Sequence, residues 1–295
     1  VSNNVFETTN ERKLGSTVQD GVILGNNLYI AVSKSNTIEV VNKNTLVSVV
    51  QIVPTPAQGN TPRDIVTDGK YVYVSMYTGV VSRIDPSTNT IDKTVAVGPN
   101  PEEMVIVNKS LYVTNSDGNN YNAGYANGKS VSKISLSDFV EEKKIAVGLN
   151  PTKITADALG NVLVLCMGDY SATPATVWKI NAEDEATSMN IPATIMDIKD
   201  NSLYVINAPY GAPFITYTVY NTSSGAVEKE NFVSAPVDAP AGIAVHSDGR
   251  IFITSYTLVG GFASYKTPGY VSEYSSDGTF VKKYDVGVGA VSMTF

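Results

Sequence analysis

A short pattern of strands and turns recurs along the chain, and it constrains the fold more than any other feature of the sequence. In residues 95–116 an apolar strand leads into GPNP (98–101), a second strand, a polar turn and a third strand. The same order returns in residues 145–169, with GLNP at 148–151. A unit of short strands that recurs every roughly 40 to 50 residues is typical of a β-propeller. Looser copies lie at residues 60–63 and 238–241.

Six such units follow one another, and each contains four expected strands, named A to D from the propeller axis outwards. The strands are rich in Val, Ile and Tyr, and their turns carry Asp-Gly, Asn and Ser-Gly, as β-hairpins require. Several inner strands are continuously apolar, which fits blades that stack face to face and cover both sides of each sheet. The expected strands occupy residues 22–24, 28–32, 37–41 and 47–53; 64–67, 71–76, 80–84 and 90–97; 104–107, 111–114, 131–134 and 141–147; 153–156, 162–167, 176–180 and 186–191; 195–198, 203–207, 216–220 and 226–232; and 242–245, 251–255, 270–274 and 280–286.

Both ends of the chain have the pattern of propeller strands. Residues 1–6 and 14–17 are expected to form a strand D, and residues 290–295 one more strand A. Pairing them in one blade would tie down both ends and remove exposed sheet edges. The sequence therefore predicts an all-β fold, a seven-bladed β-propeller in a single domain over residues 1–295. Its seventh blade would be partly missing, with strands B and C expected upstream of Val1.

Charge and composition argue against several classes of function. A net charge of -7 and a pI near 4.8, with scattered Lys and Arg, argue against nucleic acid or an anionic membrane surface as the main partner. The single cysteine, Cys166, excludes an internal disulfide bond and a cysteine-based metal cluster. The sequence contains no run of about 20 apolar residues, so no transmembrane helix is predicted. Richness in Asn, Ser, Thr, Tyr and Gly suits an exported bacterial surface protein.

The polarity of the strands places their connections on two different faces. The A-to-B and C-to-D turns are short and generic, whereas several B-to-C loops on the other face are longer than a hairpin needs. Long loops in a compact domain are usually functional or disordered. Nearly every long loop holds a tyrosine, a residue that favours recognition surfaces because it combines a large apolar area with a hydroxyl group. The long loops span residues 115–130, 168–175, 208–215 and 256–269.

A ligand-binding site is therefore expected on the loop-rich face. Neighbouring Asn and Asp side chains would add hydrogen bonds, with Asn115, Met167 and Asn207 at the inner rim. The alternative is that the aromatic side chains only pack the loops against one another. The predicted ligand-binding residues are Tyr77, Asn115, Asp117, Tyr121, Tyr125, Met167, Asp169, Tyr170, Asn207, Tyr210, Phe214, Tyr256 and Tyr265.

Motifs for catalysis or metal binding are sparse. The only histidine, His246, follows a strand A beside a short turn, on the face away from the long loops. A catalytic triad there would lack a nucleophile and an acid from those loops. Residues 117–120, DGNN, resemble part of a calcium loop but lack the bidentate Glu that such loops use. No catalytic residue, metal or resident cofactor is expected.

The repeats resemble the YVTN-type β-propeller proteins. The GPNP and GLNP units carry this resemblance, and the YVTN tetrapeptide itself is intact at residues 112–115. Degenerate copies are YVSM at 73–76, YVIN at 204–207 and FITS at 252–255. Residues 38–42, 81–85 and 273–278 are similar to the exported, YncE-like propeller lipoproteins of gut anaerobes.

This resemblance covers the whole chain and implies a function. One branch of those lipoproteins captures vitamin B12 and related corrinoids and passes them to a TonB-dependent outer-membrane transporter. The resemblance thus implies corrinoid capture at the cell surface by a non-enzymatic protein, lipid-anchored through a segment upstream of Val1. Two other functions stay open: a propeller lyase or lactonase using Asp117, Asp169 and nearby asparagines, and a protein- or glycan-binding surface module.

Overall fold

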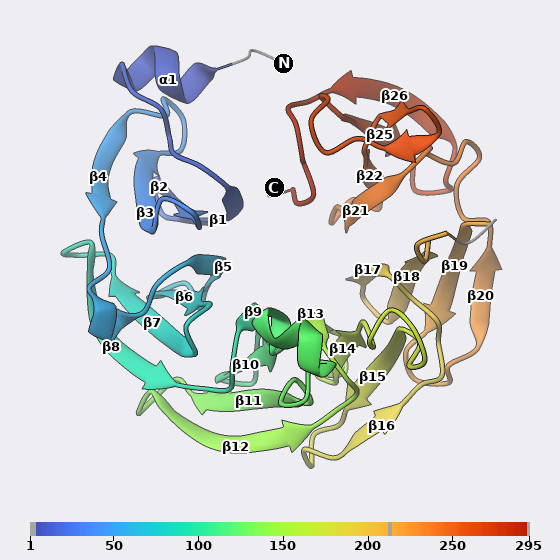
Figure 1. The fold of residues 1–295 in the computed structure, drawn as a ribbon, viewed down its shortest axis with the longest axis horizontal. Coiled ribbons are helices and arrows are strands. Elements are labelled where there is room, and N and C mark those ends of the chain that lie inside the picture. The colour runs from blue at the N-terminus through green and yellow to red at the C-terminus, as the bar shows by residue number, and fades with distance from the viewer. Residues whose placement is uncertain (1–3, 212–213, 294–295) are drawn as a thin grey trace.

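Six four-stranded antiparallel sheets stand around a central axis as the blades of a propeller (Figure 1). The computed structural model describes residues 4–211 and 214–293. Blade 1 contains β1 (Val18–Leu24), β2 (Asn27–Val32), β3 (Thr37–Asn42) and β4 (Ser48–Ile52). Blade 2 contains β5 (Pro62–Thr67), β6 (Val72–Met76), β7 (Val80–Asp85) and β8 (Thr90–Ala96). Blade 3 contains β9 (Pro101–Val107), β10 (Ser110–Asn115), β11 (Ser130–Ser135) and β12 (Val140–Ala146).

The second half of the ring repeats this arrangement. Blade 4 contains β13 (Pro151–Ala156), β14 (Val162–Cys166), β15 (Thr176–Ile180) and β16 (Ala186–Ser188). Blade 5 contains β17 (Ile195–Lys199), β18 (Ser202–Asn207), β19 (Thr216–Asn221) and β20 (Val227–Glu230). Blade 6 contains β21 (Pro240–Val245), β22 (Ile251–Ser255), β25 (Tyr270–Tyr274) and β26 (Phe280–Asp285). The predicted all-β propeller and the 24 strands of its six complete units are therefore confirmed.

Each blade is a meander whose strands pair in chain order, and tight turns connect its first strand to its second. In blade 3, Val107 pairs with Ser110 across a two-residue turn in which Asn108 and Lys109 have φ of 48° and 65°. A turn with positive φ at both central positions matches the right-handed twist of the strands it joins. The first strand of every blade consequently lies nearest the axis, and the last strand lies at the circumference.

The hydrophobic core lies between the blades. Tyr29 and Val40 of blade 1 pack with Ile65 and Val74 of blade 2 in one buried cluster, and comparable clusters join the later blades. All five residues of β14 are buried, since both faces of this sheet are covered. This burial accounts for the continuous apolar runs in the sequence.

The predicted seventh blade is wrong: the described residues form six blades. Residues 5–10 form a helix, α1 (Val5–Asn10), and the chain from residue 290 to residue 293 contains no strand. Gly15 and Thr17, with φ of 133° and 64°, interrupt the extended backbone where a strand D was expected. Residues 1–3 and 294–295, the other parts of the expected terminal strands, lie outside the described residues.

Polar contacts hold α1 against blade 1 in place of a strand. The Asn10 side chain donates hydrogen bonds to the carbonyl oxygens of Phe6 and Leu46, both at 2.9 Å, and accepts one from the Ser48 N–H at 2.7 Å. Just beyond the helix, Arg12 lies 2.7 Å from the buried carboxylate of Glu39 on β3. The N-terminal segment therefore covers the face of blade 1 that points away from blade 2. The predicted seventh blade was expected to pack on this face.

The C-terminal segment lies between blade 6 and blade 1, close to the axis (Figure 1). The Ser292 hydroxyl donates a hydrogen bond to the Gln19 carbonyl oxygen at 3.1 Å, so the segment reaches β1. On its other side it lies against β21, where a Cβ atom on Gly242 would be 2.0 Å from the Val291 carbonyl oxygen. The ring is thus bridged by irregular chain and not by a strand of a shared blade.

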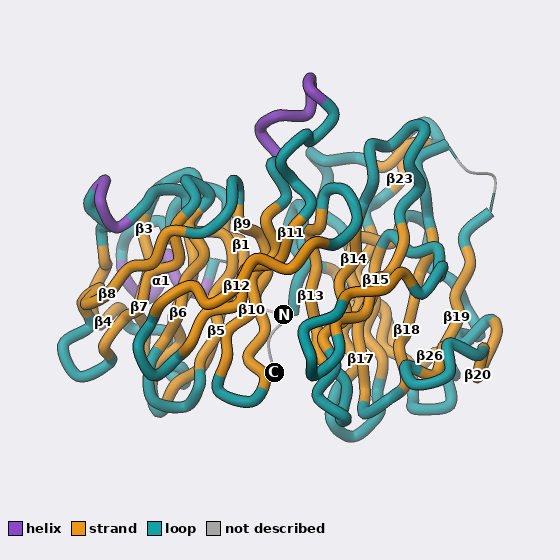
Figure 2. The backbone as a smooth tube through the Cα atoms, turned by 90° about the horizontal axis from the view of Figure 1, so that it is seen from below, coloured by secondary structure: helices purple, strands orange, loops and turns teal. Residues whose placement is uncertain are grey.

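The expected division into two faces is confirmed. Figure 2 shows the 3₁₀-helix η2 (Gly118–Ala123) and the small strand β23 (Leu258–Val259) projecting on one face, while short turns line the opposite face. We call the first the loop face and the second the turn face. A further short 3₁₀-helix, η1 (Pro56–Gln58), lies in the connection between blades 1 and 2. Among the described residues no helix is long and apolar enough to cross a membrane.

Candidate functional site

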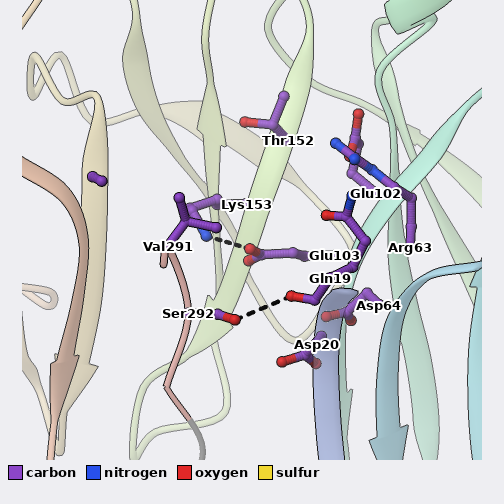
Figure 3. Close-up of a pocket in the computed structure, with 11 residues that line it drawn as sticks. Gln19, Asp20, Arg63, Asp64, Glu102, Glu103, Thr152, Lys153, Val291 and Ser292 are labelled. Atoms are coloured by element: carbon purple, nitrogen blue, oxygen red, sulfur yellow. Dashed lines mark hydrogen bonds and ion pairs between the residues drawn. The ribbon is translucent and has the colours of Figure 1, made fainter. Parts of the chain in front are cut away.

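Charged side chains of the innermost strands line the propeller axis. Asp64, Glu103 and Lys153 are each the second residue after a proline at the start of the innermost strand, in the sequences PRD, PEE and PTK. Asp20 joins them from β1 (Figure 3). Because the same repeat position faces the axis in successive blades, its side chains meet there although they are far apart in the sequence. We call these four residues the axial cluster.

The axial cluster ties neighbouring blades together. Asp64 Oδ2 accepts a hydrogen bond from the Met104 N–H of the next blade at 2.8 Å, and Asp20 Oδ2 lies 3.4 Å from the Ile65 nitrogen. Glu103 and Lys153 form an ion pair between blades 3 and 4 (Figure 3). The Asp64 and Asp20 contacts supply acceptors for the backbone N–H groups of Met104 and Ile65 at the inner edge of the sheets.

Asp197 makes the same kind of bridge one blade further on. Its Oδ2 atom accepts a hydrogen bond from the Val245 N–H at 2.7 Å, which joins β17 to β21. Burial raises the pKa of Asp197 to about 6, against the opposing effect of the hydrogen bonds from Val245 and Ile198. Desolvation disfavours a charged carboxylate, and that cost dominates here.

Burial also raises the pKa of Asp20 and Asp64. For Asp64 the neighbouring negative charges of Asp20 and Glu103 raise it further, so that its pKa lies well above the usual range. Two carboxyl groups that share one site do not both ionise readily, because each charge opposes the other. Lys153 has a raised pKa because the attraction of Glu103 outweighs the effect of burial.

A cavity of about 230 Å³ opens between these side chains. Towards the loop face it is bounded by Arg63 and Glu102, whose ion pair measures 2.6 Å. The Arg63 guanidinium also lies 5.1 Å from the centroid of the Tyr77 ring. The Ser116 hydroxyl donates a hydrogen bond to Glu102 at 3.2 Å. Burial and the nearby Glu102 carboxylate raise the pKa of Tyr77 to about 12. We call Arg63, Tyr77, Glu102 and Ser116 the mouth.

Of the four mouth residues, only Tyr77 was among the predicted site residues. Arg63 and Glu102 stand directly after the repeated prolines, in PRD and PEE, and that repeated charged position was the signal that could have found them. Nothing in their immediate sequence shows that they lie side by side. Their pairing depends on the ring, which brings the starts of β5 and β9 together.

The predicted aromatic residues stand around the loop face, and most of them are open to solvent. Two pairs are in contact: Tyr125 with Tyr170, whose ring centroids lie 6.3 Å apart, and Tyr256 with Tyr265, at 4.8 Å. Both pairs meet edge to face, as aromatic rings prefer. The first pair joins the loops of blades 3 and 4 and the second lies within the loop of blade 6, so packing explains part of each pair but leaves most of the set uncovered. Exposed fractions between 63% and 96% are found for Tyr121, Tyr170, Tyr210, Phe214 and Tyr265.

The predicted polar residues mainly shape the loops. Asn115 is fully buried, and its amide donates to the hydroxyls of Ser130 and Ser132 at 3.1 and 2.9 Å. The Asp117 carboxylate accepts hydrogen bonds from Asn120 and from the backbone of Asn127, both at 2.9 Å. These four partners come from the B-to-C loop of blade 3 or from the strand it leads into, so the contacts fix that loop.

The remaining predicted residues lie in blades 4 and 5. Asp169 Oδ1 accepts from the N–H groups of Ser171 and Thr173 at 2.9 and 2.8 Å, which closes the loop that presents Tyr170. Met167 is half-buried against the cluster between blades 4 and 5, and Asn207 is half-buried at the end of β18. None of the three stands out from the surface as the aromatic residues do.

His246 lies on the turn face, directly after β21. Its Nδ1 atom is 2.8 Å from the Asp248 carboxylate within the same short turn. Its neighbours are therefore far from the loop face in the fold, as the strand polarity indicated. Within the part of the chain that the structure describes, no group of three or more His, Cys, Asp and Glu side chains is arranged to hold a metal ion.

The stacked meander sheets and the axial cavity define this protein as a β-propeller. Comparisons with protein-family models and with curated proteins give no match. Solved structures do match. Hydrazine synthase from Kuenenia stuttgartiensis has a TM-score of 0.65 and 15% identity over 90% of this chain and 80% of that one. A protein of unknown function from Desulfotomaculum acetoxidans DSM 771 has a TM-score of 0.65 and 13% identity over 89% and 81%.

A designed protein has the same architecture. The computationally designed Ika8 protein matches with a TM-score of 0.61 and 9% identity, over 91% of this chain and 87% of that one. At such low identities the three similarities show the fold alone. A shared propeller fold carries many unrelated functions, so the function has to be argued from the loop face and the axis.

Proposed function

We propose that the protein is a non-enzymatic binding protein that captures a bulky small molecule on its loop face. The observation that carries this proposal is the set of strongly exposed aromatic side chains on four consecutive blades, all on the same face. Exposed apolar surface that gathers on one side of a soluble protein usually marks an interaction site. Covering one such ring contributes about 1–2 kcal/mol, so several together give useful affinity.

The mouth offers a polar complement to these rings. Arg63 and Glu102 are paired with each other, and the Tyr77 ring lies against the guanidinium. A ligand that spans the face would meet tyrosine hydroxyls around its edge and this polar group near the axis. The expected ligand is therefore large and amphipathic, with a broad apolar surface and polar groups at its periphery.

The use of the axial carboxyl groups supports a binding function over a catalytic one. Asp20, Asp64 and Asp197 accept hydrogen bonds from backbone N–H groups of the next blade, and Glu103 is paired with Lys153. Each group thus already has a structural partner. A general acid or base needs to face the reacting atoms of a substrate instead.

Within this proposal, a corrinoid is the first ligand to test. It has the required size and amphipathic character, and the resemblance of the repeats to corrinoid-capturing lipoproteins supports the choice. The same resemblance supports export to the cell surface and transfer of the ligand to a TonB-dependent transporter.

Isothermal titration of the protein with cyanocobalamin, beside a panel of glycans and peptides, tests the proposal. Tyr170→Ala should weaken corrinoid binding about tenfold, because it removes roughly 1.4 kcal/mol of contact. Leu159→Ala is the matched control: Leu159 is 63% exposed, as Tyr121 is, but lies in the turn between β13 and β14, on the turn face. Equal losses in the two variants, or no binding at micromolar corrinoid, would overturn the corrinoid assignment. Saturable binding of a glycan or peptide alone would reassign the site to that partner.

A further inference from the structure

The B-to-C loop of blade 6 contains a small hairpin of its own. Strands β23 (Leu258–Val259) and β24 (Phe262–Ala263) pair as Leu258 with Ala263 and Val259 with Phe262. Gly260 and Gly261 join them with φ of 61° and 85°. Two positive φ values in a two-residue turn define a tight hairpin, which glycine adopts without strain. The tip therefore has a defined shape.

The tip of this hairpin is apolar and open to solvent. Val259 is 58% exposed and Phe262 is 72% exposed, and as a cross-strand pair their side chains lie on the same side of the hairpin. Leu258, on the other side, is exposed as well. Figure 2 shows β23 at the outermost level of blade 6 on the loop face. Among the residues that the structure describes, none covers these side chains.

The polar groups at the base of the hairpin are satisfied internally. The Ser264 N–H donates to the Thr257 carbonyl at 2.9 Å, and the Thr257 hydroxyl donates to the Pro268 carbonyl at 2.8 Å. The contact between Tyr256 and Tyr265 closes the base from the side. These bonds satisfy the inward-facing backbone groups of the hairpin, and its outward-facing groups can keep hydrogen bonds to water and headgroups at the depth of the bilayer interface.

The loop also lacks the charges that resist transfer into an apolar medium. Residues 256–269 contain no Asp, Glu or Arg, in a chain with a net charge of -7. Their single charged residue, Lys266, follows Tyr265 near the base, where a long side chain can keep its ammonium group in water. Residues 208–215, the equivalent loop of blade 5, carry no charge either, and they present the exposed Tyr210 and Phe214.

We infer that this hairpin docks the protein onto a lipid bilayer by inserting Val259 and Phe262 into the interfacial region, with Tyr265, at the base of the hairpin, at the headgroup level. Tyrosine is enriched at that level in membrane proteins, since its ring is apolar and its hydroxyl is polar. A protein partner is less well matched, because protein interfaces combine aromatic side chains with Arg and a polar rim. The hairpin tip has neither.

Sedimentation with vesicles of pure phosphatidylcholine, in the absence of any other ligand, tests this inference. The wild-type protein should co-sediment with the vesicles. The double variant Val259→Asp/Phe262→Asp should lose at least about tenfold in partition coefficient, because two carboxylates would have to be dehydrated. Adding anionic lipid should not strengthen binding, since the net charge of the protein is negative. The matched control is Val281→Asp on β26, where the side chain is 53% exposed on the outer strand of the same blade.

A second measurement locates the contact. In Phe262→Trp the new indole should shift its emission to shorter wavelength on addition of vesicles, against the constant signal of Trp178, the only natural tryptophan. Absence of both co-sedimentation and the shift would overturn the inference and make a protein partner the better candidate. Equal binding of the tip variant and the Val281 control would overturn it too. Neither result depends on corrinoid binding, which is measured without lipid.

Discussion

Asp64 on the innermost strand of blade 2 accepts a hydrogen bond from the backbone N–H of Met104 on the innermost strand of blade 3, at 2.8 Å. The two residues are 40 positions apart, about one repeat of the sequence. Their contact shows that the carboxyl groups at the axis connect blades to one another. The Asp64 carboxyl group contributes in two ways that can be tested apart: it accepts a hydrogen bond, and it can carry a charge.

Replacing Asp64 tests these two properties separately. Asp64→Ala should lower the free energy of unfolding by about 1–3 kcal/mol, because the buried Met104 N–H loses its acceptor. Asp64→Asn keeps an acceptor oxygen without the charge, and it should be close to wild type or more stable at neutral pH. Urea denaturation monitored by circular dichroism measures both. If the two variants lose equal stability, the hydrogen bond to Met104 is not what matters at this position.

Asp197 should make stability fall as the pH rises from about 4 to about 6. Its pKa is raised from 3.8 to about 6, so in this range the folded protein holds a proton that the unfolded chain has released. Below about pH 4 Asp197 is protonated in both the folded and the unfolded state, so it does not change the free energy of unfolding. Above about pH 6 it is ionised in both states, and its destabilising effect no longer changes with pH. Asp197→Asn should therefore be more stable than wild type at pH 7, by up to about 3 kcal/mol.

Stability curves of the two proteins between pH 3.5 and 8 give the measurement for Asp197. The difference between them isolates this residue from Asp20 and Asp64, whose raised pKa values act in the same direction. The asparagine oxygen can still accept from Val245, so the bridge between blades 5 and 6 is retained. A difference that does not change with pH would show that Asp197 ionises normally in the fold.

The ion pair between Arg12 and Glu39 should hold the N-terminal segment on blade 1. Glu39 is fully buried and also accepts hydrogen bonds from Ser48 and Gln51. Arg12→Ala should cost about 1–3 kcal/mol, because it leaves that carboxylate without its cation. In a Glu39→Gln background the same substitution should cost much less, and a double-mutant cycle measures the difference. Additive effects would mean that the two groups are not coupled.

Cys166 should be unreactive until the protein unfolds. Burial raises the pKa of its thiol to about 12, and the thiolate is the species that reacts. Ellman's reagent at pH 8 should therefore titrate essentially no thiol in the native protein and one thiol per chain in denaturant. Prompt reaction under native conditions would show that blade 4 opens locally.

The strands could be predicted because the repeat and the turn residues act locally. Gly-Asn, Asn-Lys and Asp-Gly turns limit the strands on either side, and burial between blades explains the apolar runs. The seventh blade could not be predicted correctly, because residues 5–10 favour a helix only through contacts made elsewhere. Asn10 is held by Leu46 and Ser48, and Arg12 by Glu39, all of them distant in the sequence.

The site was predictable in part for the same reason. Loop length and tyrosine content indicated the loop face, whereas the charges at the axis were given no role: Asp64 and Lys153 were placed in strands, and Asp20 and Glu103 just before them. Arg63 and Glu102 are 39 residues apart, and only the packing of blade 2 against blade 3 brings them within 2.6 Å. Gly260-Gly261 flanked by apolar residues was a local sign of the hairpin in blade 6. The exposure of its side chains could not be predicted, because it depends on how the rest of the loop holds the hairpin away from the blades.

Each described blade takes its four strands from one continuous stretch of the chain, and none borrows a strand from the opposite end. A stretch of sequence that encodes one blade is therefore also one complete set of hydrogen-bonded ladders. Duplicating or deleting that stretch would leave the pairing inside every other blade intact and would change only the angle between neighbours. The architecture thus allows propellers of different blade number to arise from one another by copying whole units.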